Sequence, residues 1–127
     1  MGFAIFLSIC NLLIPIIMLG IGLMFEKTSP GKINQFYGYR TRRSMLNQDT
    51  WNFAHSYCGR LWKKIGIIML PLSILASLPM FWMKSDDGQG ILTCVIEGLQ
   101  IVILLVSIYP VERALKQNFD EKGNRKS

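Results

Sequence analysis

Charged residues are scarce in this chain of 127 residues, where they make up only 17% of the sequence. A soluble domain usually carries about a quarter charged residues. The apolar residues, which make up 50% of the chain, also lack the regular alternation with polar residues that a soluble core shows. They fall instead into three blocks. These deficits exclude an ordinary soluble domain and indicate a membrane protein.

The residues of metal and catalytic sites are equally few. His55 is the only histidine, and Cys10, Cys58 and Cys94 are odd in number and form no CxxC pair, which argues against a disulfide framework or a zinc site. The chain also contains no P-loop and no GxGxxG, GxSxG or HExxH motif. We therefore predict no catalytic residue, no metal, no cofactor and no enzyme activity. We expect His55 to be packed or lipid-facing, and the cysteines to be small apolar packing residues.

Three apolar runs, at about residues 2–25, 65–83 and 91–111, are each long enough to cross a membrane. A helix of about 20 residues spans the hydrocarbon core of a bilayer, and lipid cannot satisfy the open backbone groups of any other spanning segment. Glu97 is the only charged residue within the three runs. The sequence therefore predicts an all-α integral membrane protein with three transmembrane helices and a single domain over residues 1–127.

The basic residues predict an orientation. The net charge is +6, and most of the lysines and arginines lie in segment 26–64 and in tail 112–127, whereas the connection 84–90 holds one lysine and two aspartates. The positive-inside rule then places segment 26–64 and the tail in the cytoplasm of a bacterial cell and the N-terminus outside. Because these bases adjoin apolar runs, we expect anionic lipid head groups as partners and no direct contact with nucleic acid. The end of the tail is polar and is expected to fray.

The cytoplasmic segment predicts one further helix. Asn47 is a good N-cap, and from Gln48 onwards apolar residues recur at helical spacing on one face, at Trp51, Ala54 or His55, and Cys58. We expect an amphipathic, interfacial helix between the first and second spans, lying on the inner leaflet. The alternative, that this helix continues unbroken into the second span, stays open.

The same segment carries an unusual motif. Aromatic residues flank Gly38 and are followed by Arg40, a combination that can form a tight turn around a phosphate. Bases beside a membrane are also explained by the orientation rule alone. The candidate residues of this cytoplasmic motif are Asn34, Tyr37, Gly38, Tyr39, Arg40, Thr41, Ser44, Asn47, Trp51, Asn52 and His55.

This motif resembles the signature of the SdpI family: an Asn, a Gly-Tyr-Arg-Thr block, a Ser, an Asn, and a Trp followed by Ala and by Asn or His. The resemblance implies a membrane immunity protein that binds a secreted peptide toxin and protects its producer. It also implies, as an alternative, a receptor that holds a cytoplasmic regulator such as a repressor at the membrane. A small lipid-head-group enzyme or transporter is a further alternative, and a homo-oligomer stays open. The chain looks like the C-terminal unit of a longer family member.

The predicted spans contain polar residues at one depth. Under the expected topology these residues fall about 6–15 Å below the outer surface by the rise of a helix. They are Ser8 and Asn11 in the first span, Ser73 and Ser77 in the second, and Glu97 and Gln100 in the third. They predict either hydrogen bonds that pack the helices together or a polar pocket for an external peptide.

Overall fold

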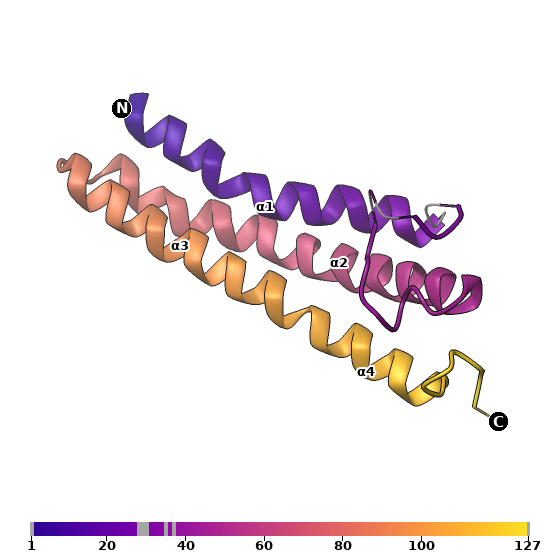
Figure 1. Ribbon diagram of the computed structural model, residues 1–127. Helices are drawn as coiled ribbons and strands as arrows, with labels where there is room; N and C mark the ends of the chain where they lie inside the picture. Colours follow the sequence, from indigo (N-terminus) through magenta and orange to yellow (C-terminus); the bar gives the residue numbers. More distant parts are fainter. Residues whose placement is uncertain (1, 28–30, 35, 37, 127) are drawn as a thin grey trace.

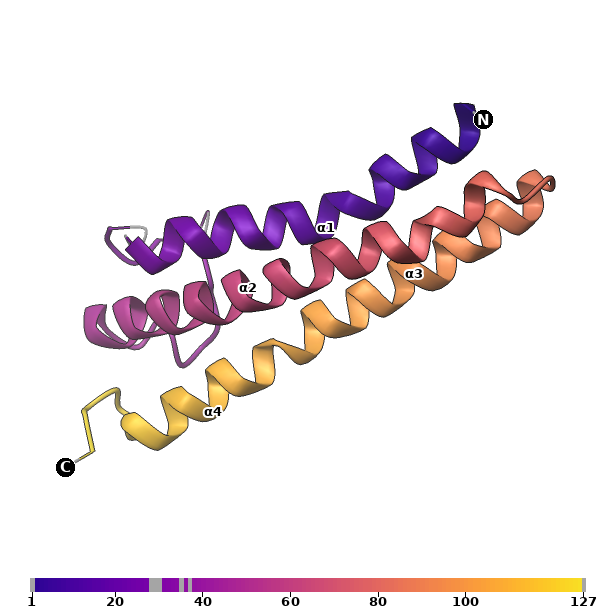
Figure 2. The same ribbon diagram turned by 180° about the vertical axis from the view of Figure 1, so that it is seen from behind.

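Three helical rods lie side by side in the computed structural model, which describes residues 2–27, 31–34, 36 and 38–126 (Figure 1). The elements are α1 (Gly2–Lys27), α2 (Gln48–Ser77), the short 3-10 helix η1 (Leu78–Phe81), α3 (Asp86–Val106) and α4 (Ile108–Asn118). The view from behind shows α4 continuing the direction of α3 (Figure 2). In the described residues, three helices are long and apolar enough to cross a membrane. The all-helical fold with three candidate spans is therefore confirmed.

The contact between α1 and α2 depends on glycine. A Cβ added at Gly22 would lie 2.5 Å from the backbone nitrogen of Lys63, and one added at Gly59 would meet the backbone of Glu26 and Phe25. Small residues allow helices to approach this closely in a membrane, where van der Waals packing drives their association. Beside this contact, the ammonium of Lys63 lies 3.1 Å from the carboxylate of Glu26. Glycine thus brings the two backbones together, and an ion pair closes the same end of the interface.

The prediction of a separate interfacial helix between the first two spans is wrong. Residues 48–77 form one unbroken helix, capped by Asn47 as predicted. At 1.5 Å per residue, its 30 residues extend about 45 Å, against about 30 Å for a hydrocarbon core. The amphipathic part is therefore the end of α2 that projects beyond the span. Its apolar face, which includes Trp51, Ala54 and Cys58, is buried against protein and not against lipid.

The tail, which the structure describes as far as residue 126, covers this face. Phe119 is buried in one cluster with Ala54, Cys58, Val111 and Leu115. The chain then turns back, and Phe119 forms an isolated bridge with Arg125. The guanidinium of Arg125 donates two hydrogen bonds, of 2.9 and 3.1 Å, to the carboxylate of Asp49 in the first turn of α2. An apolar anchor and a bidentate ion pair thus connect the polar tail to α2.

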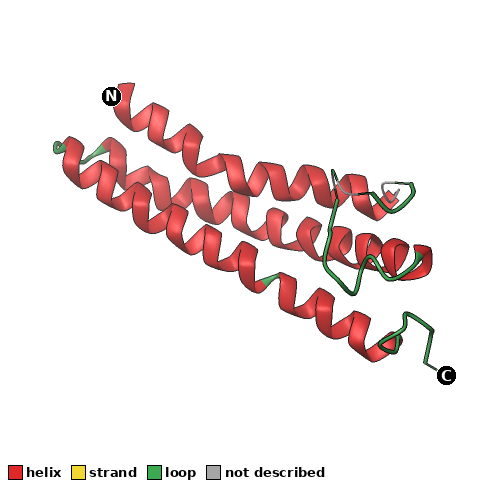
Figure 3. Ribbon diagram, in the orientation of Figure 1, coloured by secondary structure: helices red, strands yellow, loops and turns green. Residues whose placement is uncertain are grey.

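A break at Ser107 separates α3 from α4 and appears as a short green segment in Figure 3. The indole nitrogen of Trp62 in α2 donates a hydrogen bond of 3.0 Å to the hydroxyl of Ser107. The hydroxyl of Ser107 in turn donates to the carbonyl oxygen of Leu104. This bond fixes the junction against α2, so that α4 follows the projecting end of α2.

We predict that Gly59→Ala lowers the thermal unfolding midpoint of the purified protein, because overpacking of a tight contact costs about 1–3 kcal/mol. Gly20→Ala is the matched control, since a Cβ added there meets nothing within 4 Å. It should be neutral or stabilising, because alanine is better than glycine in helices by up to about 1 kcal/mol. Equal midpoints for the two variants would contradict the close packing of α1 against α2.

Candidate functional site

The motif segment is attached to α4 through one carboxylate. The phenol of Tyr39 donates a hydrogen bond of 2.7 Å to Oε2 of Glu112, and the hydroxyl of Thr41 donates one of 2.9 Å to the same oxygen. Hydrogen bonds to an ionised acceptor are about twice as strong as those between neutral groups. We call this three-residue contact, between Tyr39, Thr41 and Glu112, the clasp. It joins positions more than 70 residues apart in the chain.

The environment of the clasp keeps the Tyr39 phenol protonated. Burial raises the pKa of Tyr39 far above its usual range, and the hydrogen bond and negative charge of Glu112 raise this pKa further. Proton loss would place a second negative charge beside Glu112 in a partly desolvated position. The phenol of Tyr39, which is protonated at physiological pH in any case, therefore stays a hydrogen-bond donor to Glu112 at alkaline pH as well.

Ser44 closes the turn that presents Tyr39 and Thr41. Its buried hydroxyl accepts a hydrogen bond of 2.9 Å from the backbone N–H of Thr41 and lies 2.9 Å from the carbonyl oxygens of both Tyr39 and Thr41. Gly38, just before this turn, has a φ of 110°, a conformation that residues with a Cβ rarely adopt. The turn then leads into α2 through a capping box, in which Asn47 and Thr50 exchange backbone and side-chain hydrogen bonds.

His55 is a buried support for this turn. Its Nε2 accepts a hydrogen bond of 2.8 Å from the backbone N–H of Tyr39, and its Nδ1 lies 2.7 Å from the carbonyl oxygen of Trp51. Both contacts are satisfied by the neutral ring with its proton on Nδ1. Phe25 and Trp51 pack on the imidazole with centroid distances of 4.8 and 4.3 Å. Of the two environments expected for His55, the structure contains the packed one.

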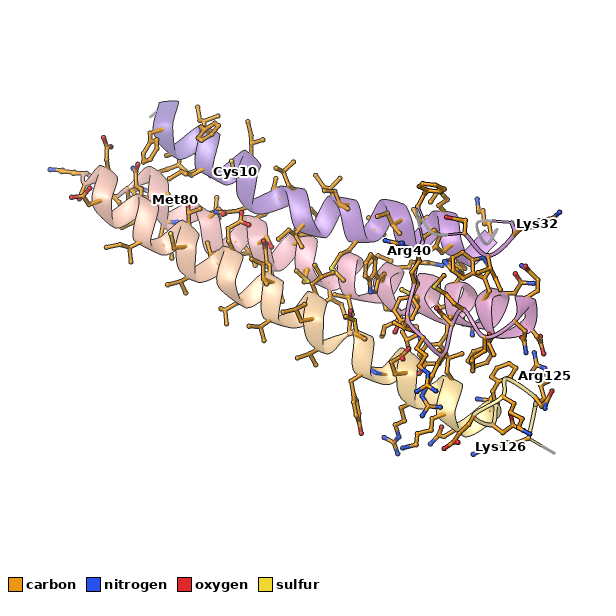
Figure 4. All side chains as sticks on the ribbon, viewed as in Figure 1. Cys10, Lys32, Arg40, Met80, Arg125 and Lys126 are labelled. Atoms are coloured by element: carbon orange, nitrogen blue, oxygen red, sulfur yellow. The ribbon has the colours of Figure 1, made fainter. Side chains whose placement is uncertain are left out.

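An apolar groove of about 400 Å³ lies under the motif. Figure 4 shows Arg40 beside the ends of α1 and α2, among the side chains that crowd this end of the bundle. The motif contributes Gly38, Tyr39, Arg40 and Thr41 to the wall, and the helices contribute Ile21, Phe25, Cys58, Trp62, Leu104, Leu105 and Ile108. The motif thus closes one end of a hydrophobic space between the helices.

Four of the polar residues predicted in the spans meet in the bundle. The amide of Asn11 donates a hydrogen bond of 3.0 Å to the hydroxyl of Ser77. The amide of Gln100 lies 2.7 Å from the carbonyl oxygen of Asn11 and 2.8 Å from the hydroxyl of Ser73. All four residues are buried. One polar residue from α1, two from α2 and one from α3 thus form a network that joins the three helices.

The other two predicted residues stand apart from this network. In the described residues, the hydroxyl of Ser8 has no hydrogen-bond partner, and no hydrogen bond joins Glu97 to the other five. The side-chain oxygens of Asn11 and Gln100 are also buried without a partner. Each such buried oxygen carries the cost of its lost hydration.

A second groove, of about 740 Å³, lies between the N-terminal ends of α1 and α3. Two carboxylates, of Asp86 and Asp87, stand at the first turn of α3, and apolar side chains form most of the remaining wall. The lining residues are Phe3, Asp86, Asp87, Gly90, Ile91, Cys94 and Val95. Glu97 follows Cys94 by three positions and so continues the same side of α3 one turn farther along. We call this the acidic groove.

The family model for the SdpI/YfhL protein family matches residues 31–111, which is more than half of the chain. The chain belongs to the SdpI/YfhL family. It is also 35% identical over 65 residues to the uncharacterized protein YfhL of Bacillus subtilis (strain 168). That match covers 51% of this chain and 59% of the relative's length. No solved structure matches the chain.

Most residues of the family motif lie together, and a few lie apart from them. One connected region around the start of α2 contains the clasp, Ser44, Asn47, Trp51 and His55. Asn34 instead forms a local turn with the backbone of Phe36, and Asn52 lies on the exposed side of α2 beside Gln48. Tyr37 lies outside the described residues. The metal-ligating side chains of the described residues form no group of three that could hold an ion.

Sequence reasoning missed Glu112, the acceptor of the clasp, because the tail was treated as a block of basic charge. The available signal was its position as the one acidic residue between 108 and 118, directly before Arg113. Thr50 was missed as well, although its spacing of three residues from Asn47 fits a capping box. Both residues satisfy buried or partly buried polar groups of the motif.

We predict that Glu112→Ala releases the motif segment from α4, because Tyr39 and Thr41 lose a charged acceptor. A hydrogen bond to a charged group contributes about 1.5–3 kcal/mol. Backbone amide exchange of residues 38–46 should become faster, while exchange in α1 and in the second half of α2 stays unchanged. The control is Asp87→Ala, which removes an exposed carboxylate at the other end of the molecule. If the two variants exchange alike, the clasp does not hold the segment.

Proposed function

We propose that this member of the SdpI/YfhL family is a membrane immunity protein that protects its cell against a secreted, membrane-active peptide. The observation that carries the proposal is the family match over residues 31–111, since an immunity role is what the family signature implies. Three apolar helices fit a multi-pass protein positioned in the same membrane that such a peptide attacks. The chain would act by binding the peptide before the peptide can disrupt the bilayer.

The acidic groove is the binding site that we propose for this peptide. Its apolar wall, including Phe3, Ile91 and Val95, is exposed and can receive hydrophobic side chains. The carboxylates of Asp86 and Asp87 can pair with lysine or arginine side chains at the rim. Glu97 would extend this negative charge into the membrane, where a carboxylate is costly and is for that reason a candidate for function. The expected ligand is therefore a cationic, amphipathic peptide.

The hydrogen-bonded network of Asn11, Ser73, Ser77 and Gln100 has a supporting role in this proposal. These side chains are buried and bind one another, so they fit the packing alternative better than an open pocket. Such bonds contribute about 0.6 kcal/mol each in a membrane. They would hold the three helices in a fixed arrangement, which the groove between α1 and α3 requires.

The proposal requires the acidic groove to face the outside of the cell and the basic end to face the cytoplasm. In a background without Cys10, Cys58 and Cys94, a membrane-impermeant maleimide added to intact cells should label Asp87→Cys. It should label Arg43→Cys and Lys122→Cys only after the cells are broken, because the positive-inside rule predicts that their basic segments lie in the cytoplasm. Labelling of Arg43→Cys in intact cells would show the opposite orientation. The acidic groove would then face the cytoplasm and could not be an external site.

We predict that Asp86→Asn/Asp87→Asn and Glu97→Gln each reduce the protection of a sensitive bacterium against a cationic membrane-active peptide. The carboxamides retain the shape of the groove but not its charge, and a mutated rim charge acts mainly on association. Glu121→Gln is the control, because it removes one acidic charge at the other end of the molecule. Protein levels in the membrane are compared by immunoblot. Full protection by all of the groove variants would exclude binding through charge.

A further inference from the structure

A third groove, of about 590 Å³, opens beside α4 at the end of the bundle away from the acidic groove. Its basic side chains come from three separate parts of the chain. Arg43 belongs to the motif segment, Arg113 and Lys116 project from α4, and Lys126 comes from the tail, at the end of the bundle where Figure 4 labels it. The other lining residues are Tyr109, Glu112 and Gln117. We call this the basic groove.

The positive charge of this groove is not neutralised within the protein. Lys63 pairs with Glu26 and Arg125 pairs with Asp49, whereas no base of the basic groove forms an ion pair within the described part of the chain. Glu112 is the one carboxylate in the lining, and its Oε2 already accepts the hydrogen bonds of Tyr39 and Thr41. The lining thus contains four basic side chains and one carboxylate, and that carboxylate is already hydrogen-bonded within the clasp. A smaller hollow shares Arg43 and Glu112 with this groove and adds one base, Arg42, and one acid, Glu121.

The position of the groove indicates what kind of anion it binds. It begins where the apolar surface of α3 ends, and the last residues of that surface are exposed. Their exposed fractions are 60% for Leu105, 62% for Val106 and 67% for Tyr109. Tyrosine favours the level of the lipid head groups, because its ring is apolar and its hydroxyl is polar. A ligand with a phosphate and an acyl chain can therefore bind the groove and α3 together, whereas an acidic soluble protein would leave this apolar surface unused.

We propose that the basic groove binds the phosphate of an anionic phospholipid head group. Arg43 and Arg113 each present a planar guanidinium that can bind phosphate through two parallel hydrogen bonds, and Lys116 and Lys126 add point charges. The acyl chains lie along the exposed apolar side of α3. The clasp takes part in this site indirectly, because it holds the motif segment, and with it Arg43, against α4. The proposal does not depend on the immunity function.

The test uses the full chain, purified in a neutral detergent at low salt, and measures the thermal unfolding midpoint as lipid is added. Phosphatidylglycerol should raise the midpoint, because a ligand of the folded state stabilises it, and phosphatidylcholine should not. In Arg43→Gln/Arg113→Gln/Lys116→Gln, the phosphatidylglycerol concentration needed for half of the effect should rise by about tenfold or more, as expected for the loss of charge-assisted hydrogen bonds.

The matched control is Lys32→Gln/Arg60→Gln/Lys64→Gln, which removes the same number of positive charges from residues outside the lining of the groove. It should respond to phosphatidylglycerol like the unchanged protein, and both triple variants should unfold cooperatively without lipid. An equal loss of the lipid effect in the two variants would mean diffuse attraction and overturn the proposal.

Two further ligands distinguish the source of the anion. Inorganic phosphate, added at the same concentrations, should give no comparable shift, because it lacks the acyl chains. An equal shift with phosphate would show a site for the free ion, and the lipid assignment would be wrong. A poly-glutamate peptide that stabilises the protein when phosphatidylglycerol does not would assign the groove to an acidic protein partner instead.

Discussion

The length of α2 determines the arrangement of the whole molecule. A helix of 30 residues is about 15 Å longer than the hydrocarbon core, and the part that projects still has an apolar face. Water cannot cover that face favourably, so other parts of the chain must do so. The motif segment covers it from one side, and α4 with the tail covers it from the other. Both coverings are needed because α2 continues as one helix through Gly59.

The protein therefore has two ends with different chemistry. At one end, two aspartates stand at the rim of an apolar groove between α1 and α3. At the other, the clasp binds a loop to α4 beside a cluster of bases. Between them, the glycine contact and the hydrogen bonds of Asn11 and Gln100 hold the helices together. The two ends thus offer chemically different surfaces on one helical bundle.

Composition was enough to predict the three spans, because long uncharged runs have no other stable solution in lipid. The face of α2 that would be buried was also predictable from helical spacing, at Trp51, Ala54 and Cys58. What covers that face was not predictable from local pattern. Lipid and protein are both apolar partners, and the periodicity of α2 is the same for either. The decisive contacts, such as Phe119 against Ala54 and Arg125 with Asp49, join residues far apart in sequence.

The candidate site could be predicted only in part, because its contacts also join residues far apart in sequence. The motif identified Tyr39, Thr41 and His55 as important, but it did not indicate whether they bind a ligand or one another. Their principal partners, Glu112 and the backbone N–H of Tyr39, emerge only from the fold. Four of the six polar residues predicted at one depth in the spans do meet in the bundle. Glu97 lies at a similar depth but takes no part in their network. Depth fixes the height of a residue along a helix but not the side of the bundle that it faces.

The sequence separation across the clasp has a consequence for biosynthesis. A ribosome makes residues 39–41 long before Glu112, and the apolar face of α2 emerges well before Phe119 that covers it. Until residues 111–119 have been made, nothing from α4 or the tail can cover the apolar face of α2, and exposed apolar surface of this kind favours aggregation. A chain truncated before Glu112 could still insert all three spans, yet it would keep that surface exposed. Burial of the projecting end of α2 therefore has to wait until residues 111–119 have been made.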